Sequence, residues 1–213
     1  MRIERYVHMT SSEVCLDGKR LETTSIGSSL LSELYRSYMG DYPKFFKMDM
    51  LCKLGVVTAE LLVRDDKSRF EPREDRAVLL FSKSGPLLND IHYEKTTLAE
   101  DYFPSPSLFV YTLANIVTGE ISIRNKYRGD TTAFELVEFD SQAIADNVEA
   151  AFEDKVTSSA VCGWVECLSP DSFEALMMLV TREGDGMPFN AETIKKSDSY
   201  YGRIDQESQA SDD

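Results

Sequence analysis

Few side chains in this sequence are suited to covalent or acid–base chemistry. The cysteines lie in apolar or strand-like runs and form no Cys-x-x-Cys pair, and two histidines are too few for the usual zinc ligand sets. We therefore expect reduced, mostly buried thiols, no metal site and no cofactor. The candidate side chains are the thiols of Cys15, Cys52, Cys162 and Cys167 and the imidazoles of His8 and His92.

A serine and a lysine follow the apolar run 77–81, which has the composition of a buried parallel strand. Ser82 and Lys83 thus lie at the carboxyl end of a strand, where α/β proteins often place functional groups. Adjacent residues on a strand point to opposite faces, so Lys83 is poorly placed to accept the proton of Ser82. We interpret the pair as a strand-end loop, and His92 as a surface or packing histidine.

The best functional lead is a carboxylate, Glu138, at the end of a helix–turn–strand segment. Ser105 and Pro106 open this segment, apolar residues follow at approximately helical spacing, and Gly129 precedes an alternating run that leads into Glu138. A carboxylate among apolar groups can act as a nucleophile or as a base with a raised pKa. The alternative is a solvated polar residue at a strand end, which needs no catalytic partner, and we prefer it.

The same segment resembles the β-ketoacyl synthases of the thiolase-like superfamily. In that family, a Ser-Pro start, a central Asn, a small-x-Gly step and an Arg-Gly end precede the strand that carries the nucleophile. The matching residues are Ser105-Pro106, Asn115, Thr118-Gly119-Glu120 and Arg128-Gly129.

Two further stretches extend the resemblance to roughly residues 40–182. Residues 162–166 resemble the Gly-Gly-x-Glu strand of the family, with Trp164 in place of the second glycine. Residues 48–63 resemble the second helix of the same half. The set is specific when it is taken together, although each piece is weak alone.

The resemblance implies that the catalytic cysteine is missing. In the family, the strand after Arg-Gly ends in a cysteine between small residues, and a carboxyl-terminal half supplies two basic side chains. Counting on from Gly129 places Glu138 at the cysteine position, with the bulkier Phe139 and Asp140 after it, and the sequence ends where the second half would begin. A condensing enzyme needs a thiolate and an oxyanion site. We expect no condensing activity from this chain alone.

Two functions are consistent with the resemblance. The first is a catalytically inactive ketosynthase-like protein that dimerises or acts as a chain length factor does, in fatty acid or polyketide biosynthesis. The second is a subunit of a split 3-oxoacyl-[acyl-carrier-protein] synthase, an acyltransferase that is active only when another chain supplies the histidines. A neighbouring gene for a complete synthase favours the first, and a gene for the missing half favours the second.

The resemblance also implies a partner. Family dimers pair the strand before the nucleophile across a two-fold axis, and helix 107–125 is apolar around much of its circumference, more than one sheet can cover. We expect a homodimer or a heterodimer with a full-length ketosynthase. The interface candidates are Thr131, Ala133, Glu135 and Val137.

Three basic residues in five suggest a contact with an acyl carrier protein. Arg124, Lys126 and Arg128 stand out on an acidic chain, and carrier proteins are acidic. The alternative is a solvated helix end whose cations interact with the helix dipole.

The composition excludes several classes of partner. A net charge of −14 disfavours nucleic acids and anionic membranes, because both are bound through clustered Lys and Arg. No apolar run is long enough for a membrane helix, and the amino end has no hydrophobic signal region. We expect a cytoplasmic protein.

The pattern of elements predicts an α/β fold, a thiolase-like half-domain with a mixed five-stranded sheet and helices on both faces. This domain is expected to span residues 1–190, because 213 residues with 42% hydrophobic content suffice for one core. Asp17-Gly18 predicts the turn of an amino-terminal hairpin. Residues 191–213 are polar and predict a flexible tail.

Overall fold

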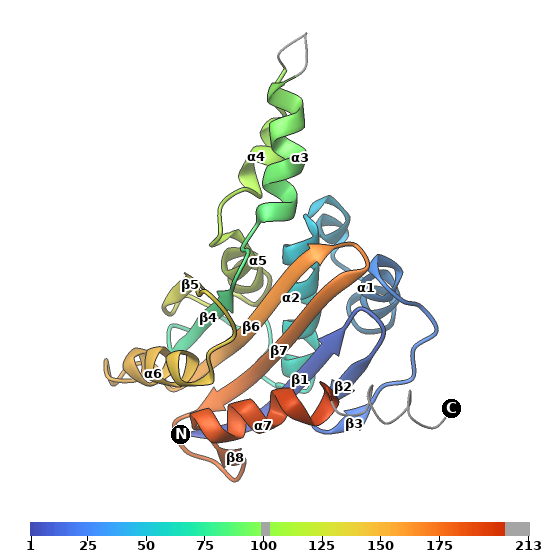
Figure 1. Ribbon diagram of the computed structural model, residues 1–213. Helices are drawn as coiled ribbons and strands as arrows, with labels where there is room; N and C mark the ends of the chain where they lie inside the picture. The colour runs from blue at the N-terminus through green and yellow to red at the C-terminus, as the bar shows by residue number, and fades with distance from the viewer. Residues whose placement is uncertain (99–102, 203–213) are drawn as a thin grey trace, which may run out of the picture.

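The computed structural model describes residues 1–98 and 103–202 of the protein, and within them one mixed sheet lies between two layers of helices (Figure 1). The strands are β1 (Arg2–Thr10), β2 (Val14–Leu16), β3 (Lys19–Arg20), β4 (Arg76–Ser82), β5 (Thr131–Glu135), β6 (Ser159–Ser169), β7 (Ser172–Thr181) and β8 (Met187–Pro188). The helices are α1 (Ser28–Leu34), α2 (Met50–Val63), α3 (Leu87–Thr97), α4 (Pro106–Val110), α5 (Ile116–Asn125), α6 (Ser141–Ala151) and α7 (Ala191–Gly202), with a π-helical turn (Tyr35–Met39) and a 3-10 helix (Pro43–Lys47) between α1 and α2.

The strand order is β3-β2-β1-β7-β6-β4-β5, and β8 pairs with β1. β5, β4 and β6 are parallel, whereas β6, β7 and β1 pair antiparallel. The predicted mixed α/β sheet is confirmed: its five strands are the five longest, β5, β4, β6, β7 and β1. The short strands β2 and β3 form the predicted amino-terminal hairpin, and β8 extends the sheet beyond the prediction.

The amino-terminal turn forms as predicted. Asp17 and Gly18 both have positive φ, 50° and 77°, between β2 and β3. Successive residues with positive φ characterise the two-residue hairpin turn that Asp-Gly favours.

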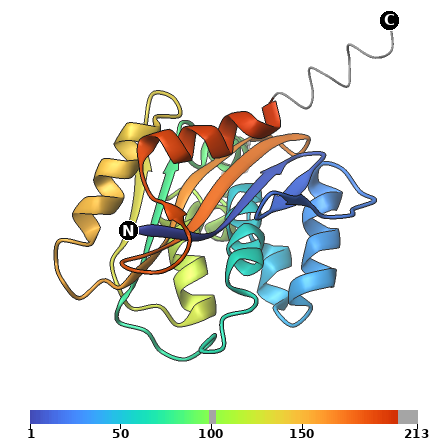
Figure 2. The same cartoon turned by 90° about the horizontal axis from the view of Figure 1, so that it is seen from below.

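Two separate apolar cores fill the two faces of the sheet (Figure 2). α1, α2 and α5 cover one face, and α6 and α7 cover the other. α2 begins at Asp49, whose carboxylate accepts the backbone N–H groups of Leu51 and Cys52. α2 and α5 approach closely at Gly55, because a Cβ atom there would lie 2.5 Å from Cγ2 of Val117.

The long helix predicted over 107–125 is wrong, because the chain breaks between α4 and α5. The hydroxyl of Thr112 donates to the carbonyl of Phe109, and that of Thr118 donates to the carbonyl of Asn115. Such side-chain bonds compete with helical ones. α5 is also covered within this single chain by α2, β4 and β5, so its apolar character does not require a partner.

The polar tail predicted from residue 191 is also wrong over its first part, because residues 191–202 form α7. The carboxamide of Asn190 accepts the N–H of Thr193 at 2.9 Å, as a helix cap does. Ile194 is fully buried against α6 and the sheet, and Phe189 is nearly so. The average polarity of the segment hides these two anchors. Residues 203–213 lie outside the described part of the chain.

Candidate functional site

The parallel strands β4, β5 and β6 have their carboxyl ends at the same end of the sheet. The resemblance places the nucleophile position of the ketosynthases at this end. Glu138 lies there, in the loop between β5 and α6, with its side chain exposed to solvent. Asp140, two residues on, is the cap of α6 and accepts the N–H groups of Gln142 and Ala143 at 2.9 and 3.0 Å. Glu138 therefore lies outside the helix terminus, and its side chain forms no hydrogen bond or ion pair with the residues described.

Among the residues described, no thiol or imidazole forms a hydrogen bond or ion pair with Glu138. The four cysteines are free and buried, as predicted. Burial raises the pKa of Cys167 to about 12, and it also raises the pKa of Cys52 and Cys162. His8 is buried in β1, and His92 is exposed on α3. The arrangement offers no thiolate and no base beside the carboxylate.

Glu138→Ala should have little effect on stability. An exposed side chain without partners contributes within about 0.5 kcal/mol to the free energy of unfolding. Urea unfolding of the two proteins measures this difference. If the variant also abolished a turnover seen in wild type, the carboxylate would be catalytic, contrary to the preferred interpretation.

A second carboxylate, Glu166, organises the loop after β4. Its Oε2 accepts the backbone N–H groups of Lys83 at 2.7 Å and Ser84 at 3.1 Å, and lies 3.4 Å from the hydroxyl of Ser82. The Ser82 hydroxyl in turn accepts the N–H of Gly85 at 2.6 Å. Ser82 and Lys83 are therefore a strand-end loop, as interpreted from the sequence. The resemblance identified Glu166, but its distant backbone partners left no signal in the sequence.

Glu166→Ala should lower the free energy of unfolding by about 2–3 kcal/mol, because two backbone N–H groups lose a charged acceptor. The amides of Lys83 and Ser84 should exchange with solvent faster, which hydrogen exchange measures. Glu166→Gln keeps one acceptor oxygen and should show a smaller loss. Unchanged exchange at Lys83 and Ser84 in the alanine variant would contradict this role.

β5 forms an open edge of the sheet, since within the described chain it pairs only with β4. Val78 donates its N–H to the carbonyl of Asp130, and Leu136 donates to the carbonyl of Ser82, both at 2.8 Å. Backbone groups alternate in direction along a strand, so the even-numbered residues bond to β4. The odd-numbered candidates Thr131, Ala133 and Glu135 direct their backbone groups outward. Val137, just beyond β5, is 87% exposed.

α3 and α4 form an arm that projects beyond the sheet (Figure 1). This α3–α4 arm, residues 87–98 and 103–113, carries exposed apolar side chains, although the rings of Tyr93 and Phe109 pack together at 5.5 Å. α4 has no buried residue. The exposed apolar residues are Leu87, Ile91, Leu98, Phe103, Phe109, Val110 and Leu113. Such a concentration is typical of a surface that binds another protein.

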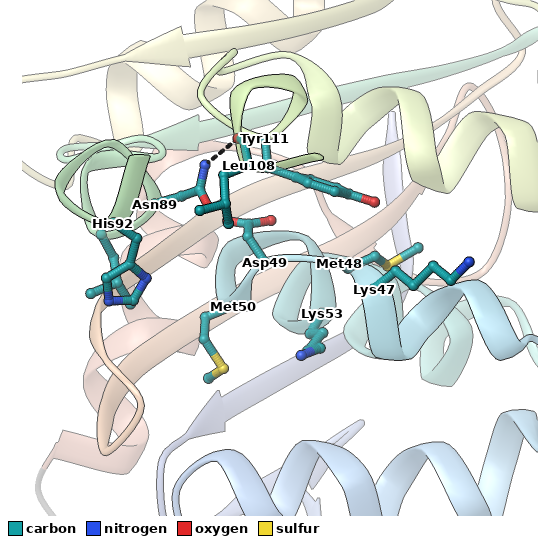
Figure 3. A pocket seen from close by; sticks show the side chains of 10 residues that line it. Lys47, Met48, Asp49, Met50, Lys53, Asn89, His92, Leu108 and Tyr111 are labelled. Atoms are coloured by element: carbon teal, nitrogen blue, oxygen red, sulfur yellow. Dashed lines mark hydrogen bonds between the residues drawn. The ribbon is translucent and has the colours of Figure 1, made fainter. Parts of the chain in front are cut away.

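A cavity of about 230 Å³ lies between the α3–α4 arm and the start of α2 (Figure 3). Asn89, which is buried, donates from its amide to the carbonyl of Leu108 at 2.8 Å and so joins α3 to α4. Burial raises the pKa of Asp49, which also lines the cavity. The ten residues that line it include His92 but no serine, threonine or cysteine. The cavity therefore lacks the serine, threonine or cysteine that most commonly serves as a His-activated nucleophile, and its one hydroxyl is the phenol of Tyr111.

Arg124, a predicted contact with a carrier protein, takes part in an ion-pair network within the fold. Its side chain is 9% exposed, and it donates to Asp41 at 2.7 Å and to Glu60 at 3.4 Å. Its guanidinium also lies 4.7 Å from the ring centre of Tyr42 and 4.9 Å from that of Phe70. Its charge is thus used within the fold.

The other two basic candidates are exposed. Lys126 ends α5 in the left-handed conformation, with φ 58°. Arg128 is 63% exposed and pairs with Glu74 at 3.4 Å. Their contact with a carrier protein stays a prediction.

Two structural surveys bear on other partners. No described helix has the length and apolar character to cross a membrane. In residues 1–98 and 103–202, no group of three or more His, Cys, Asp or Glu side chains is arranged to hold a metal ion.

Comparison with known proteins identifies the fold. No protein-family model matches the sequence, and no curated protein matches it. Among solved structures, the ishigamide ketosynthase/chain length factor has a TM-score of 0.60 at 15% identity, over 85% of this chain and 62% of that one. The structure of AntDE:AntF, a type II polyketide synthase acyl carrier protein in complex with its ketosynthase bound to the hexaketide, gives 0.55 at 12% identity over the same shares.

A third similar structure matches a chain of nearly the same length. It is the ketosynthase ApeO in complex with its chain length factor ApeC from Xenorhabdus doucetiae, with a TM-score of 0.51 at 11% identity. The match covers 94% of this chain and 91% of that one, whereas the chain spans 62% of the first structure. At these identities the similarity establishes the fold, a thiolase-like half-domain like those of ketosynthases and chain length factors.

Proposed function

We propose that this chain is a cytoplasmic, catalytically inactive partner of a full-length ketosynthase in polyketide or fatty acid biosynthesis, comparable to a chain length factor. One observation carries the proposal: the open edge of β5 lies directly before Glu138, which the resemblance places at the nucleophile position and which forms no hydrogen bond or ion pair with the residues described. A surface suited to pairing thus remains at the position where the chemistry is missing.

The α3–α4 arm adds contact area to the interface that the edge of β5 would form. β5 alone offers few contacts, whereas a stable specific complex buries on the order of 1,600 Å² in total. Leu136 bonds to Ser82 at the end of β4, just before the arm begins, so edge and arm are joined through the β4 loop. An open backbone edge beside exposed apolar groups is a common combination in protein recognition.

The length of the matched chain in the ApeO–ApeC structure also supports the proposal. A chain that this protein matches over 91% of its length is part of an assembly of a ketosynthase with its chain length factor. A chain of this size is therefore compatible with such an assembly.

The split-synthase alternative meets a chemical obstacle. Histidines supplied by another chain would act on an acyl group held by a thiol, and Glu138 cannot form a thioester. The four free thiols are buried. We therefore favour a partner role over a catalytic one.

Co-expression with a full-length ketosynthase, chosen from a neighbouring gene where one encodes it, tests the proposal. We expect a stable one-to-one complex by light scattering, and condensing activity with malonyl and acyl carrier-protein thioesters only when the ketosynthase is present. A chain that remains separate from the ketosynthase at low micromolar concentration would contradict the proposal, as would turnover by the isolated chain.

A further inference from the structure

The strand β5 and the residues that follow it carry a one-sided charge, whereas the exposed cation Arg128, which precedes β5, pairs with Glu74. Residues 130–140 contain four carboxylates and no lysine, arginine or histidine. Asp130 and Glu135 are exposed at the two ends of the strand, and Glu138 is exposed just beyond it. The fourth, Asp140, caps α6. The loop after β4 adds a single cation, Lys83.

The base of the α3–α4 arm places a further carboxyl group, Asp90, near Glu135. Oδ1 of Asp90 is buried and has no hydrogen-bond donor among the residues described. Burial and the nearby carboxylates of Glu135 and Asp49 raise the pKa of Asp90. Asp90 and Glu135 thus belong to one acidic region at the junction of the arm and the edge.

Pairing with a second copy would place these carboxylates against one another. A two-fold axis sets β5 antiparallel beside its own copy, so the four carboxylates become eight in one two-stranded ribbon. Eleven residues extend over about 37 Å, and the Debye length at 0.1 M salt is about 10 Å. Neighbouring like charges therefore repel, and charges on an edge strand are a known protection against self-pairing.

We propose that the β5 edge rejects a second copy of this chain and recognises a strand of a different chain that presents lysine or arginine beside it. This inference rests on the proposed partner role and selects the heterodimer from the two assemblies that the sequence allowed. Main-chain hydrogen bonds supply the pairing, and opposite charge selects the partner.

A charge-reversed form of this chain provides a defined probe. The triple variant Asp130→Lys, Glu135→Lys, Glu138→Lys changes three exposed positions and leaves the cap Asp140 in place. Residues 130–140 then carry three positive charges and one negative. Sedimentation of wild type, of the variant and of their mixture measures association at about 0.02 M and about 0.5 M salt.

We expect the mixture to associate at least about tenfold more tightly than wild type with itself at low salt, and to lose most of this advantage at high salt. Adding Ala133→Pro to the variant should remove the mixed pair, because it blocks the backbone edge. The inference would be overturned if wild type paired with itself through β5 as tightly as it pairs with the variant in the mixture. A mixture that does not associate would overturn it as well.

Binding to the ketosynthase separates this inference from the proposed function. The triple variant should bind the ketosynthase at least about tenfold more weakly than wild type at low salt. If the triple variant and wild type bound the ketosynthase equally, charge would not select the partner, and the proposed partner role would still stand. If wild type does not bind the ketosynthase but the mixture still pairs, the partner role fails and the charge rule stands.

Discussion

Replacing Ala133 with proline should weaken binding to the ketosynthase by at least about 100-fold, because the edge of β5 can no longer pair. Proline lacks the N–H that Ala133 directs away from β4, and its ring occupies the space a partner strand needs. The hydrogen bonds of β4 go to the even-numbered residues of β5, so they remain. Light scattering and titration of the complex measure the loss.

Ala133→Val is the matched control, because valine keeps the N–H and favours strands. It should bind within a few-fold of wild type. Both variants should unfold within about 1 kcal/mol of wild type, as expected for substitutions at a half-buried position of an edge strand. Equal binding by the proline and valine variants would show that the interface lies elsewhere, with the exposed side chains of the α3–α4 arm as the next candidates.

Local patterns predicted the core of the fold well. The apolar run at 77–81 became β4, and Asp17-Gly18 became a turn with positive φ at both residues. These features depend on composition and spacing over a few residues, where backbone preferences and burial agree.

The missed features depend on partners that are distant in sequence. Glu166 bonds to Lys83, 83 residues away, and Arg124 bonds to Asp41, also 83 residues away. The sequence showed Arg124 as one of three nearby cations, whereas folding places it beside carboxylates that neutralise it. Single-sequence reasoning finds chemistry-bearing residues, but pairing between distant segments decides which of them remain available at the surface.

The helix errors have a different cause. α7 was missed because only Phe189 and Ile194 anchor a segment that is otherwise polar. The helix over 107–125 was drawn too long because its apolar spacing continues across Thr112, whose hydroxyl bonds to the backbone instead. Periodicity reports which face is apolar, and it is insensitive to a single competing side-chain hydrogen bond.

Replacing Gly163 with alanine should have the largest effect on stability of any single methyl addition proposed. Gly163 lies in the central strand β6 with φ 142°, a conformation that L residues rarely adopt, and a Cβ atom there would lie 2.0 Å from the carbonyl oxygen of Leu176 in β7. The obstacle is backbone, so it moves only if β6 and β7 separate. We expect a loss of about 4 kcal/mol or more in the free energy of unfolding.

The matched control is the same substitution at Gly119, in the interior of α5, where an added Cβ atom would meet nothing within 4 Å. Alanine there should stabilise the chain by about 0.5–1 kcal/mol, because glycine is the weaker helix former. For a domain of this size the two changes correspond to a fall in Tm of about 8–16 °C and a rise of about 1–4 °C. Calorimetry distinguishes these opposite signs. A Gly163→Ala protein that melts with wild type would mean that β6 and β7 can adjust to a side chain at their closest approach.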